Sequence, residues 1–438
     1  LDRSREFGIS ATDDEHADLG AVGRHGVHAF HDQIRRIDRR LAPRPHLGDT
    51  VLYSQDGRGL DERLIAEEDG RFGEAASEPG DRAGPRERKG TELGAVRRVA
   101  GESSGGLDEV MPTLLADHGP LAARGAQFKK LPALGLRVGD RAVTLMADGD
   151  TLSIIDGVDR AGIVAELEAD ALSDLLQDRQ STMGLAMTSR VQITAGSRDE
   201  WIHWEPALRA LCEGRPVHEP GAVVMRDLDG EPLDLDRRFG LDDDPEELAH
   251  FLAEAGFLHL HDVFDPSEMA AIEADIDQSI AAARDADPEY WWCTDADGTQ
   301  VAVRSLNFQE KSAAVRATLA DERLTRLADL TGDGHRAPTK CEGLVKPLDI
   351  VAGLSDLPWH KDCGQGLHSY MCNSLTVGIS VTGADRVSGA LGVVAGSHRA
   401  NTTASVRDKR LDLPAKLLET TTGDLTIHCS DTLHRAYP

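Results

Sequence analysis

The fold is decided by a short stretch near the C-terminal end, residues 357–362, which reads Leu-Pro-Trp-His-Lys-Asp. The side-chain period of a β-strand is two, so His360 and Asp362 on one strand project to the same side, and Lys361 points away. An imidazole and a carboxylate on one side can both reach a single metal ion. A His-x-Asp pair is common by chance in an acidic chain, so it needs a further ligand.

A second stretch, residues 423–434, contains candidate ligands and reads Gly-Asp-Leu-Thr-Ile-His-Cys-Ser-Asp-Thr-Leu-His. Its histidines are His428 and His434, and a straight strand would keep both on one face. Two histidines and one carboxylate, with the remaining positions open, form the facial triad of non-haem iron(II) oxygenases. The same donors also suit zinc, so a zinc-bound, cupin-like hydrolase is an alternative.

Four features, in order along residues 246–438, resemble the phytanoyl-CoA dioxygenase family of iron(II)/2-oxoglutarate oxygenases. They are the helix–strand–helix entry over 251–280, the Trp-His-Lys-Asp motif at 359–362, the stretch Ser-Gly-Ala-Leu-Gly-Val-Val-Ala-Gly-Ser-His-Arg at 388–399, and the Gly-Asp of 423–424 leading to Leu433-His434. The resemblance implies a double-stranded β-helix, a cupin-like jelly roll, with flanking helices over residues 245–438.

The resemblance also assigns roles to individual residues. It implies that His360, Asp362 and His434 hold iron(II), and that His428 supports a ligand instead of binding the metal. It implies 2-oxoglutarate and dioxygen as co-substrates, and hydroxylation of an unactivated C–H bond of a small molecule. Asp362 argues against a halogenase, in which a small residue replaces the carboxylate.

Binding of 2-oxoglutarate is expected to involve further residues. In this family an Arg roughly ten residues past the distal histidine pairs with the far carboxylate of 2-oxoglutarate, and we expect that Arg beyond Pro438, where the sequence ends. Lys346, which we place on the strand fourteen residues before His360, is the candidate for a further co-substrate contact. A surface lysine that extends its charge into solvent is the ordinary alternative. His368 is a substrate-side candidate, and His398 is expected to be structural.

Residues 111–223 have the pattern of a small α+β domain. Alternating apolar residues on both sides of the Asp-Gly-Asp turn at 148–150 predict a hairpin. Apolar residues at helical spacing predict helices from Gly162 and from Trp201. The order of elements resembles the sterol-carrier-protein type of lipid-binding domain, although a packing or oligomerisation domain fits equally well. Residues 224–244 are predicted to be a solvated acidic linker.

Residues 1–110 have a different composition from the rest of the chain. They contain no Met, Cys or Trp, and Lys89 is their only lysine. They are either a disordered arm or a non-native upstream segment. We prefer the second interpretation, because solvated arms are usually rich in lysine, serine and glutamine, whereas this segment is rich in arginine, glycine and aspartate. No function is assigned to it.

Net charge and composition exclude several functions. With 76 acidic and 48 basic residues the formal charge is −28, which repels nucleic-acid phosphates. No uncharged apolar run approaches the roughly 18 residues of a transmembrane helix. Six cysteines without a Cys-x-x-Cys pair indicate a reducing, cytoplasmic location. A lipid-binding carrier protein with an inactive oxygenase-like domain is a second alternative; the sequence selects neither a substrate nor an oligomeric state.

Overall fold

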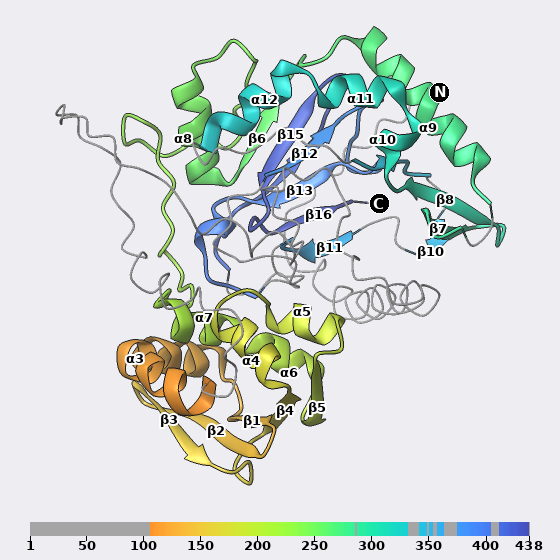
Figure 1. Ribbon diagram of the computed structural model, residues 1–438. Helices are drawn as coiled ribbons and strands as arrows, with labels where there is room; N and C mark the ends of the chain where they lie inside the picture. The colour runs from red at the N-terminus through yellow and green to blue at the C-terminus, as the bar shows by residue number, and fades with distance from the viewer. Residues whose placement is uncertain are drawn as a thin grey trace, which may run out of the picture.

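The computed structural model describes residues 106–284, 287–331, 341–347, 350–353, 357–362, 375–403 and 411–437 (Figure 1). The interpretation of residues 1–105 and the role of His368 lie outside this part of the chain. No helix within it is long and apolar enough to cross a membrane. The described residues build an N-terminal and a C-terminal unit, whose hydrophobic cores span residues 107–217 and 239–429.

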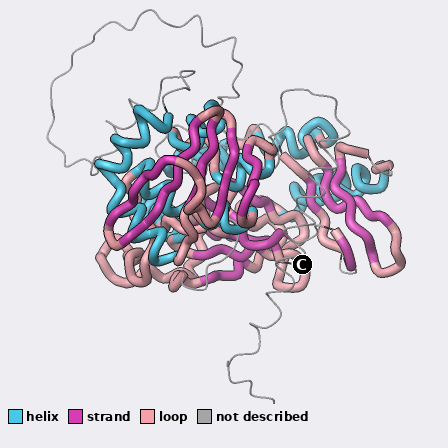
Figure 2. Tube along the Cα trace, turned by 90° about the horizontal axis from the view of Figure 1, so that it is seen from below, coloured by secondary structure: helices cyan, strands magenta, loops and turns pink. Residues whose placement is uncertain are grey.

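The N-terminal unit is a five-stranded sheet covered by helices, and its strands lie side by side in the foreground of Figure 2. The strands are β1 (Leu134–Val138), β2 (Arg141–Asp148), β3 (Thr151–Asp156), β4 (Ile163–Leu167) and β5 (Val191–Ala195), in the order β3-β2-β1-β4-β5 with β1 and β4 parallel. The helices are η2 (Gly106–Val110), α3 (Met111–Lys129), α4 (Ala169–Leu176), α5 (Thr182–Met187), α6 (Arg198–His203) and α7 (Glu205–Glu213).

The predicted hairpin is confirmed, because β2 and β3 pair antiparallel around Gly149, whose φ is +56°. The helix predicted from Gly162 is wrong over its first half. Residues 163–167 form β4, in which Ile163 and Ala165 are fully buried. A short apolar run buried on both faces cannot be distinguished from a helix by periodicity. The unit also begins earlier than Met111, since Leu107 is 6% exposed and belongs to the core.

The C-terminal unit opens with the predicted helix–strand–helix entry: α8 (Pro245–Ala255), β6 (Phe257–Leu260) and α9 (Pro266–Ala282). The Asp244 carboxylate caps α8 by accepting a hydrogen bond from the Glu246 backbone N–H at 3.0 Å. Gly256 ends α8 with φ +79°, a conformation that strains other residues. These local signals fix both ends of α8 from the sequence alone.

Six further strands, together with β6, form two antiparallel sheets. They are β11 (Leu357–His360), β12 (Leu375–Ile379), β13 (Leu391–Val394), β14 (Ala415–Leu418), β15 (Leu425–Cys429) and β16 (His434–Ala436), in the orders β11-β16-β13-β14 and β12-β15-β6. The chain passes from one sheet to the other after β11, β12, β14 and β15. This crossing pattern is that of a jelly roll, as predicted.

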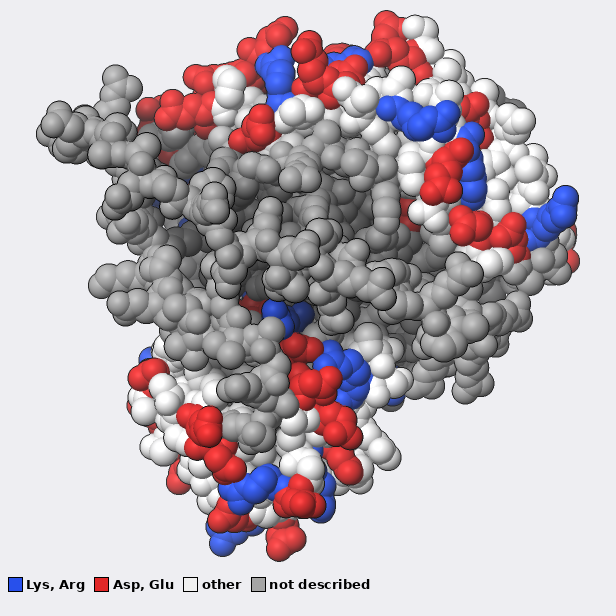
Figure 3. All heavy atoms as spheres, viewed as in Figure 1, with Lys and Arg blue, Asp and Glu red and all other residues white. Residues whose placement is uncertain are grey.

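Shorter elements surround this core. They are α10 (Phe308–Lys311), α11 (Ala313–Leu319), α12 (Glu322–Ala328), η3 (Asp329–Thr331), η5 (Ser397–Arg399), and the sheet β10-β7-β8-β9 made of β7 (Tyr290–Asp295), β8 (Gln300–Ser305), β9 (Gly343–Leu344) and β10 (Ile350–Ala352). On the face shown in Figure 3, the described Lys and Arg side chains stand among acidic ones.

The acidic segment 224–244 is largely exposed, as its charge predicts, but it is anchored to the C-terminal unit at Phe239. Phe239 is fully buried, forms a parallel bridge with Leu260 and packs edge-on against Phe251 at 5.1 Å. Its backbone exchanges two 2.9 Å hydrogen bonds with His259 and His261. The segment covers the free edge of β6, whose backbone groups need partners when buried.

Candidate metal centre

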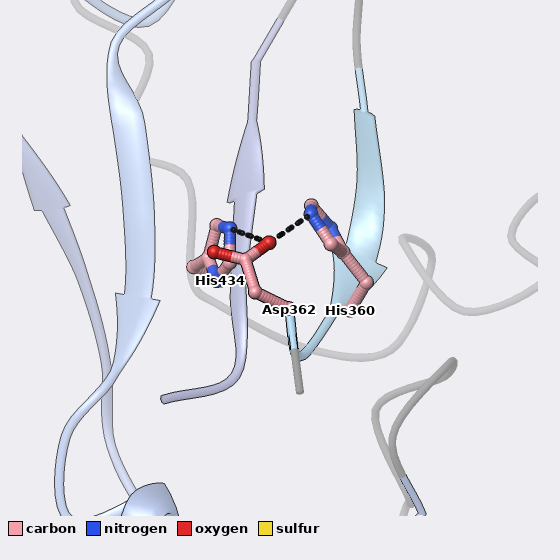
Figure 4. A group of neighbouring side chains, drawn as sticks. All are labelled: His360, Asp362 and His434. Carbon is pink, nitrogen blue, oxygen red and sulfur yellow. Dashed lines mark ion pairs between the residues drawn. The ribbon is translucent and has the colours of Figure 1, made fainter. Parts of the chain in front are cut away.

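The sheet order brings together two stretches that are 74 residues apart in the sequence. Strands β11 and β16 pair antiparallel, and His360 lies opposite His434 in the register. Asp362 lies two residues after the last residue of β11, and its side chain lies between the two histidines (Figure 4). Asp362, His360 and His434 thus offer ligand atoms that all lie within 4.8 Å of one another.

Both histidines present the same nitrogen to the same oxygen. His360 Nε2 lies 3.5 Å and His434 Nε2 lies 3.6 Å from Asp362 Oδ1. The opposite nitrogens donate to backbone carbonyls, His360 Nδ1 to Pro358 at 2.7 Å and His434 Nδ1 to Thr432 at 2.9 Å. A proton held on Nδ1 leaves the Nε2 lone pair free to bind a metal.

The protonation states favour a divalent cation. Burial alone would raise the pKa of Asp362, but His434, His360 and His428 hold it well below its usual range. Burial and the neighbouring His428 lower the pKa of His434, so this imidazole is neutral. An ionised carboxylate and a neutral imidazole are the forms in which these groups bind metals.

The other carboxylate oxygen of Asp362 contacts a different pair of residues. Thr376 Oγ1 donates to Oδ2 at 3.1 Å, and His428 Nε2 lies 3.7 Å from it. The His428 ring also packs at 4.0 Å from the His434 ring. His428 and Thr376 therefore approach Asp362 from the side opposite Oδ1. Sequence reasoning missed Thr376, since only the pairing of β12 with β15 places it opposite His428.

This centre lies inside a segment that matches a known family. The model of the phytanoyl-CoA dioxygenase (PhyH) family matches residues 252–438. Residues 252–438 therefore form a domain of the PhyH family, here called the dioxygenase domain. The sequence-based domain boundary near residue 245 lies about two helix turns before residue 252, at the first residue of α8. The chain has no significant match among curated proteins.

Several solved structures resemble the chain at low identity. They include AviO1 from Streptomyces viridochromogenes (22% identity, 44% of this chain and 88% of that chain, TM-score 0.35), the non-haem alpha-ketoglutarate-dependent epimerase SnoN from nogalamycin biosynthesis (20%, 44% and 75%, 0.34), and EctD from S. alaskensis with 2-oxoglutarate and 5-hydroxyectoine (19%, 51% and 80%, 0.36). One of these proteins is an epimerase, and another was crystallised with a hydroxylated ectoine.

Lys346 lies in the dioxygenase domain two residues after β9, not on a strand as expected. Its Nζ donates to the carbonyl of Tyr437 at 2.9 Å, close to the described end of the chain. Its role toward a co-substrate stays a prediction. His398 donates through Nε2 to the Ala253 carbonyl at 2.9 Å, and burial lowers its pKa to about 4, which suits a neutral structural residue.

Lys361 points away from the centre, as the strand period predicts, but it does not reach solvent. It is fully buried in the dioxygenase domain, and its Nζ donates to the carbonyls of Ser397 at 2.9 Å and Ala400 at 3.2 Å. Burial lowers its pKa to about 8, although the Asp431 carboxylate 3.1 Å away opposes this shift. The sequence gives no local sign of this buried cation.

Proposed function

We propose that this protein is a non-haem iron(II)- and 2-oxoglutarate-dependent dioxygenase that hydroxylates an unactivated C–H bond of a small molecule. The observation that supports it most directly is the convergence of His360 Nε2 and His434 Nε2 on Asp362 Oδ1 at 3.5 and 3.6 Å. Two imidazoles and one carboxylate from a jelly roll suit iron(II) and leave further coordination positions for co-substrates.

In this proposal His360, Asp362 and His434 would hold iron(II). The bound iron supplies, with dioxygen and 2-oxoglutarate, a C–H oxidation coupled to decarboxylation to succinate and carbon dioxide. The carbonyls of Pro358 and Thr432 favour the tautomers that carry the proton on Nδ1, which turns each Nε2 lone pair toward the metal position. Thr376 holds the second carboxylate oxygen, which fixes the direction in which Oδ1 points.

The proposed substrate is a small molecule. A lipid-like substrate would gain support if residues 111–223 carried lipid. The cavity between α5 and α7, lined by buried Glu205 and Arg209, holds only about 10 Å³ and cannot take an acyl chain. That cavity therefore does not favour the carrier hypothesis, and a polar substrate is equally compatible with the proposed centre.

An anaerobic titration tests the proposal. Iron(II) added with 2-oxoglutarate to the protein with its native C-terminus should give a weak visible charge-transfer band, and admission of dioxygen should then produce succinate. His360→Ala should abolish both signals, whereas His250→Ala should leave both intact, since His250 lies on α8 and bonds the Arg226 carbonyl.

The alternatives give different results. A zinc-bound hydrolase would bind metal through the same three residues but show no 2-oxoglutarate-dependent band and no succinate. A carrier with an inactive dioxygenase domain would show neither signal, and the wild-type and His360→Ala proteins would be indistinguishable. Either pattern would refute the oxygenase proposal.

A further inference from the structure

The N-terminal unit ends against the loop that follows η5. Asn401 is 1% exposed, pairs with Val217 in a parallel bridge and accepts the His218 backbone N–H at 2.9 Å. Its side-chain Nδ2 donates to the carbonyls of Pro206 at 2.8 Å and Arg215 at 2.9 Å. These contacts fix residues 206–218 on the dioxygenase domain, so a charge carried by this segment has a defined position.

Arg215 extends from that segment toward the metal centre. Its Nη2 donates to the His398 carbonyl at 2.6 Å, and its Nη1 lies 3.6 Å from Asp431 Oδ2. The Asp431 side chain is 4% exposed, and its Oδ1 lies 3.1 Å from Nζ of the fully buried Lys361. Arg215, Asp431 and Lys361 therefore form a continuous chain of opposite charges from the N-terminal unit into the His-Lys-Asp motif.

Two of these three charged residues, Lys361 and Asp431, are close in sequence to the proposed ligands. Lys361 stands between His360 and Asp362, and Asp431 precedes His434 by three residues. Separating opposite charges is costly in the interior, where the low dielectric screens them little. The Lys361–Asp431 pair thus holds the two ligand-bearing segments at a fixed separation.

We propose that Arg215 is a positioning residue of the metal centre, acting through Asp431 and Lys361, and that the N-terminal unit thereby forms part of this centre. The inference rests on the proposed metal centre. Arg209, buried on α7, also interacts electrostatically with Asp431. The carboxylate of Asp431 therefore lies among three cations, Lys361 of the dioxygenase domain and Arg215 and Arg209 of the N-terminal unit.

A role limited to joining the two units makes a different prediction. In that case loss of Arg215 would lower the melting temperature of the metal-free protein and leave its affinity for metal unchanged. If Arg215 positions the ligands, the affinity falls even at temperatures where every variant is folded, because the ligands no longer start in the binding geometry.

The test is an anaerobic titration of the full chain with Co²⁺ alone. Visible absorption reports the coordination geometry, competition with a chromophoric chelator gives the affinity, and melting of the metal-free protein is followed by circular dichroism. Arg215→Gln and Asp431→Asn should each weaken Co²⁺ binding roughly 10-fold or more and change the bands. The matched control is Arg190→Gln, since Arg190 is a partly exposed arginine whose partners Asp170 and Asp174 lie in the N-terminal unit; it should bind as wild type.

Two further variants test the route of the effect. The double variant Arg215→Gln/Asp431→Asn should bind Co²⁺ no more weakly than the weaker single variant, because both residues act through one chain. Arg215→Lys keeps the charge but not the planar fork, and should recover part of the affinity. If Arg215→Gln does not fold, the Co²⁺ affinity of Arg215→Lys takes its place: a lower affinity than wild type supports the positioning role, and wild-type affinity overturns it.

The outcomes separate this inference from the proposed function. Wild-type Co²⁺ affinity in the Arg215 and Asp431 variants overturns the positioning role and leaves the metal centre in place. A wild-type chain that takes up no Co²⁺ overturns the metal centre itself, and the positioning role with it.

Discussion

Replacement of His434 and of His428 should affect metal affinity very differently, although their rings lie 4.0 Å apart. His434→Ala removes one of the two imidazoles that converge on Asp362 Oδ1. His428→Phe keeps a ring against His434 and removes both imidazole nitrogens, of which Nε2 lies 3.7 Å from Oδ2. The two variants therefore distinguish a ligand from a residue that supports one.

The expected magnitudes follow from this geometry. Structural metal sites with four protein ligands gain about 10–16 kcal/mol on binding, or roughly 2.5–4 kcal/mol per ligand. At 1.4 kcal/mol per tenfold change, loss of His434 should weaken binding roughly 100- to 1000-fold. Loss of a group that supports a ligand typically costs 10–100-fold. Because the His428 contact is longer than a hydrogen bond, we expect about a 10-fold loss.

Competition between the protein and a chromophoric chelator for Co²⁺ measures these affinities. His250→Ala is the control for removing an imidazole elsewhere, on α8. A His428→Phe variant that binds as weakly as His434→Ala would refute the reasoning, because His428 would then be a ligand. Wild-type affinity in His434→Ala would refute the triad altogether.

Three further predictions concern stability. Gly423→Ala should lower the free energy of unfolding in urea by about 3 kcal/mol or more, because φ is +89° and the new Cβ would collide with the Phe264 carbonyl oxygen. The control is Gly149→Ala, at φ +56° with nothing within 4 Å of the new Cβ, which should lower it by only about 1 kcal/mol. Equal losses in the two variants would contradict this prediction. Asn401→Ala should cost about 2–4 kcal/mol, because two donors are lost from the buried junction of the units, and an unchanged unfolding curve would count against this. His259 is 7% exposed, and burial with a nearby arginine lowers its pKa from 6.5 to about 4. The unfolded chain therefore takes up a proton first, and His259 should contribute about 3 kcal/mol of the stability that the wild type loses between pH 6.5 and 4. In urea titrations at both pH values, His259→Gln should lose less stability than the wild type by about that amount, and equal losses would contradict this.

Some elements of the fold were readable from local sequence and others were not. The ends of α8 are set by Asp244, Pro245 and Gly256, which act on the backbone next to them. Residues 163–167 were mistaken for helix because their burial comes from strands β1 and β5 on either side, which the local pattern does not contain. Phe239 was placed in a solvated linker because the acidic residues around it conceal its packing against β6.

The sequence by itself predicted the jelly-roll architecture and the candidate triad His360, Asp362 and His434 through the motifs that resemble the phytanoyl-CoA dioxygenase family. The two-residue strand period added that His360 and Asp362 project to one side. Only the tertiary structure decided which carboxylate oxygen each histidine faces, and that Thr376 holds the other one. It alone also placed Asp431 between Lys361 and an arginine of the N-terminal unit. Such contacts depend on sheet order and on the junction between the two units. The strength of the Coulomb interaction in them depends on distance in space and on burial, and a sequence pattern records neither.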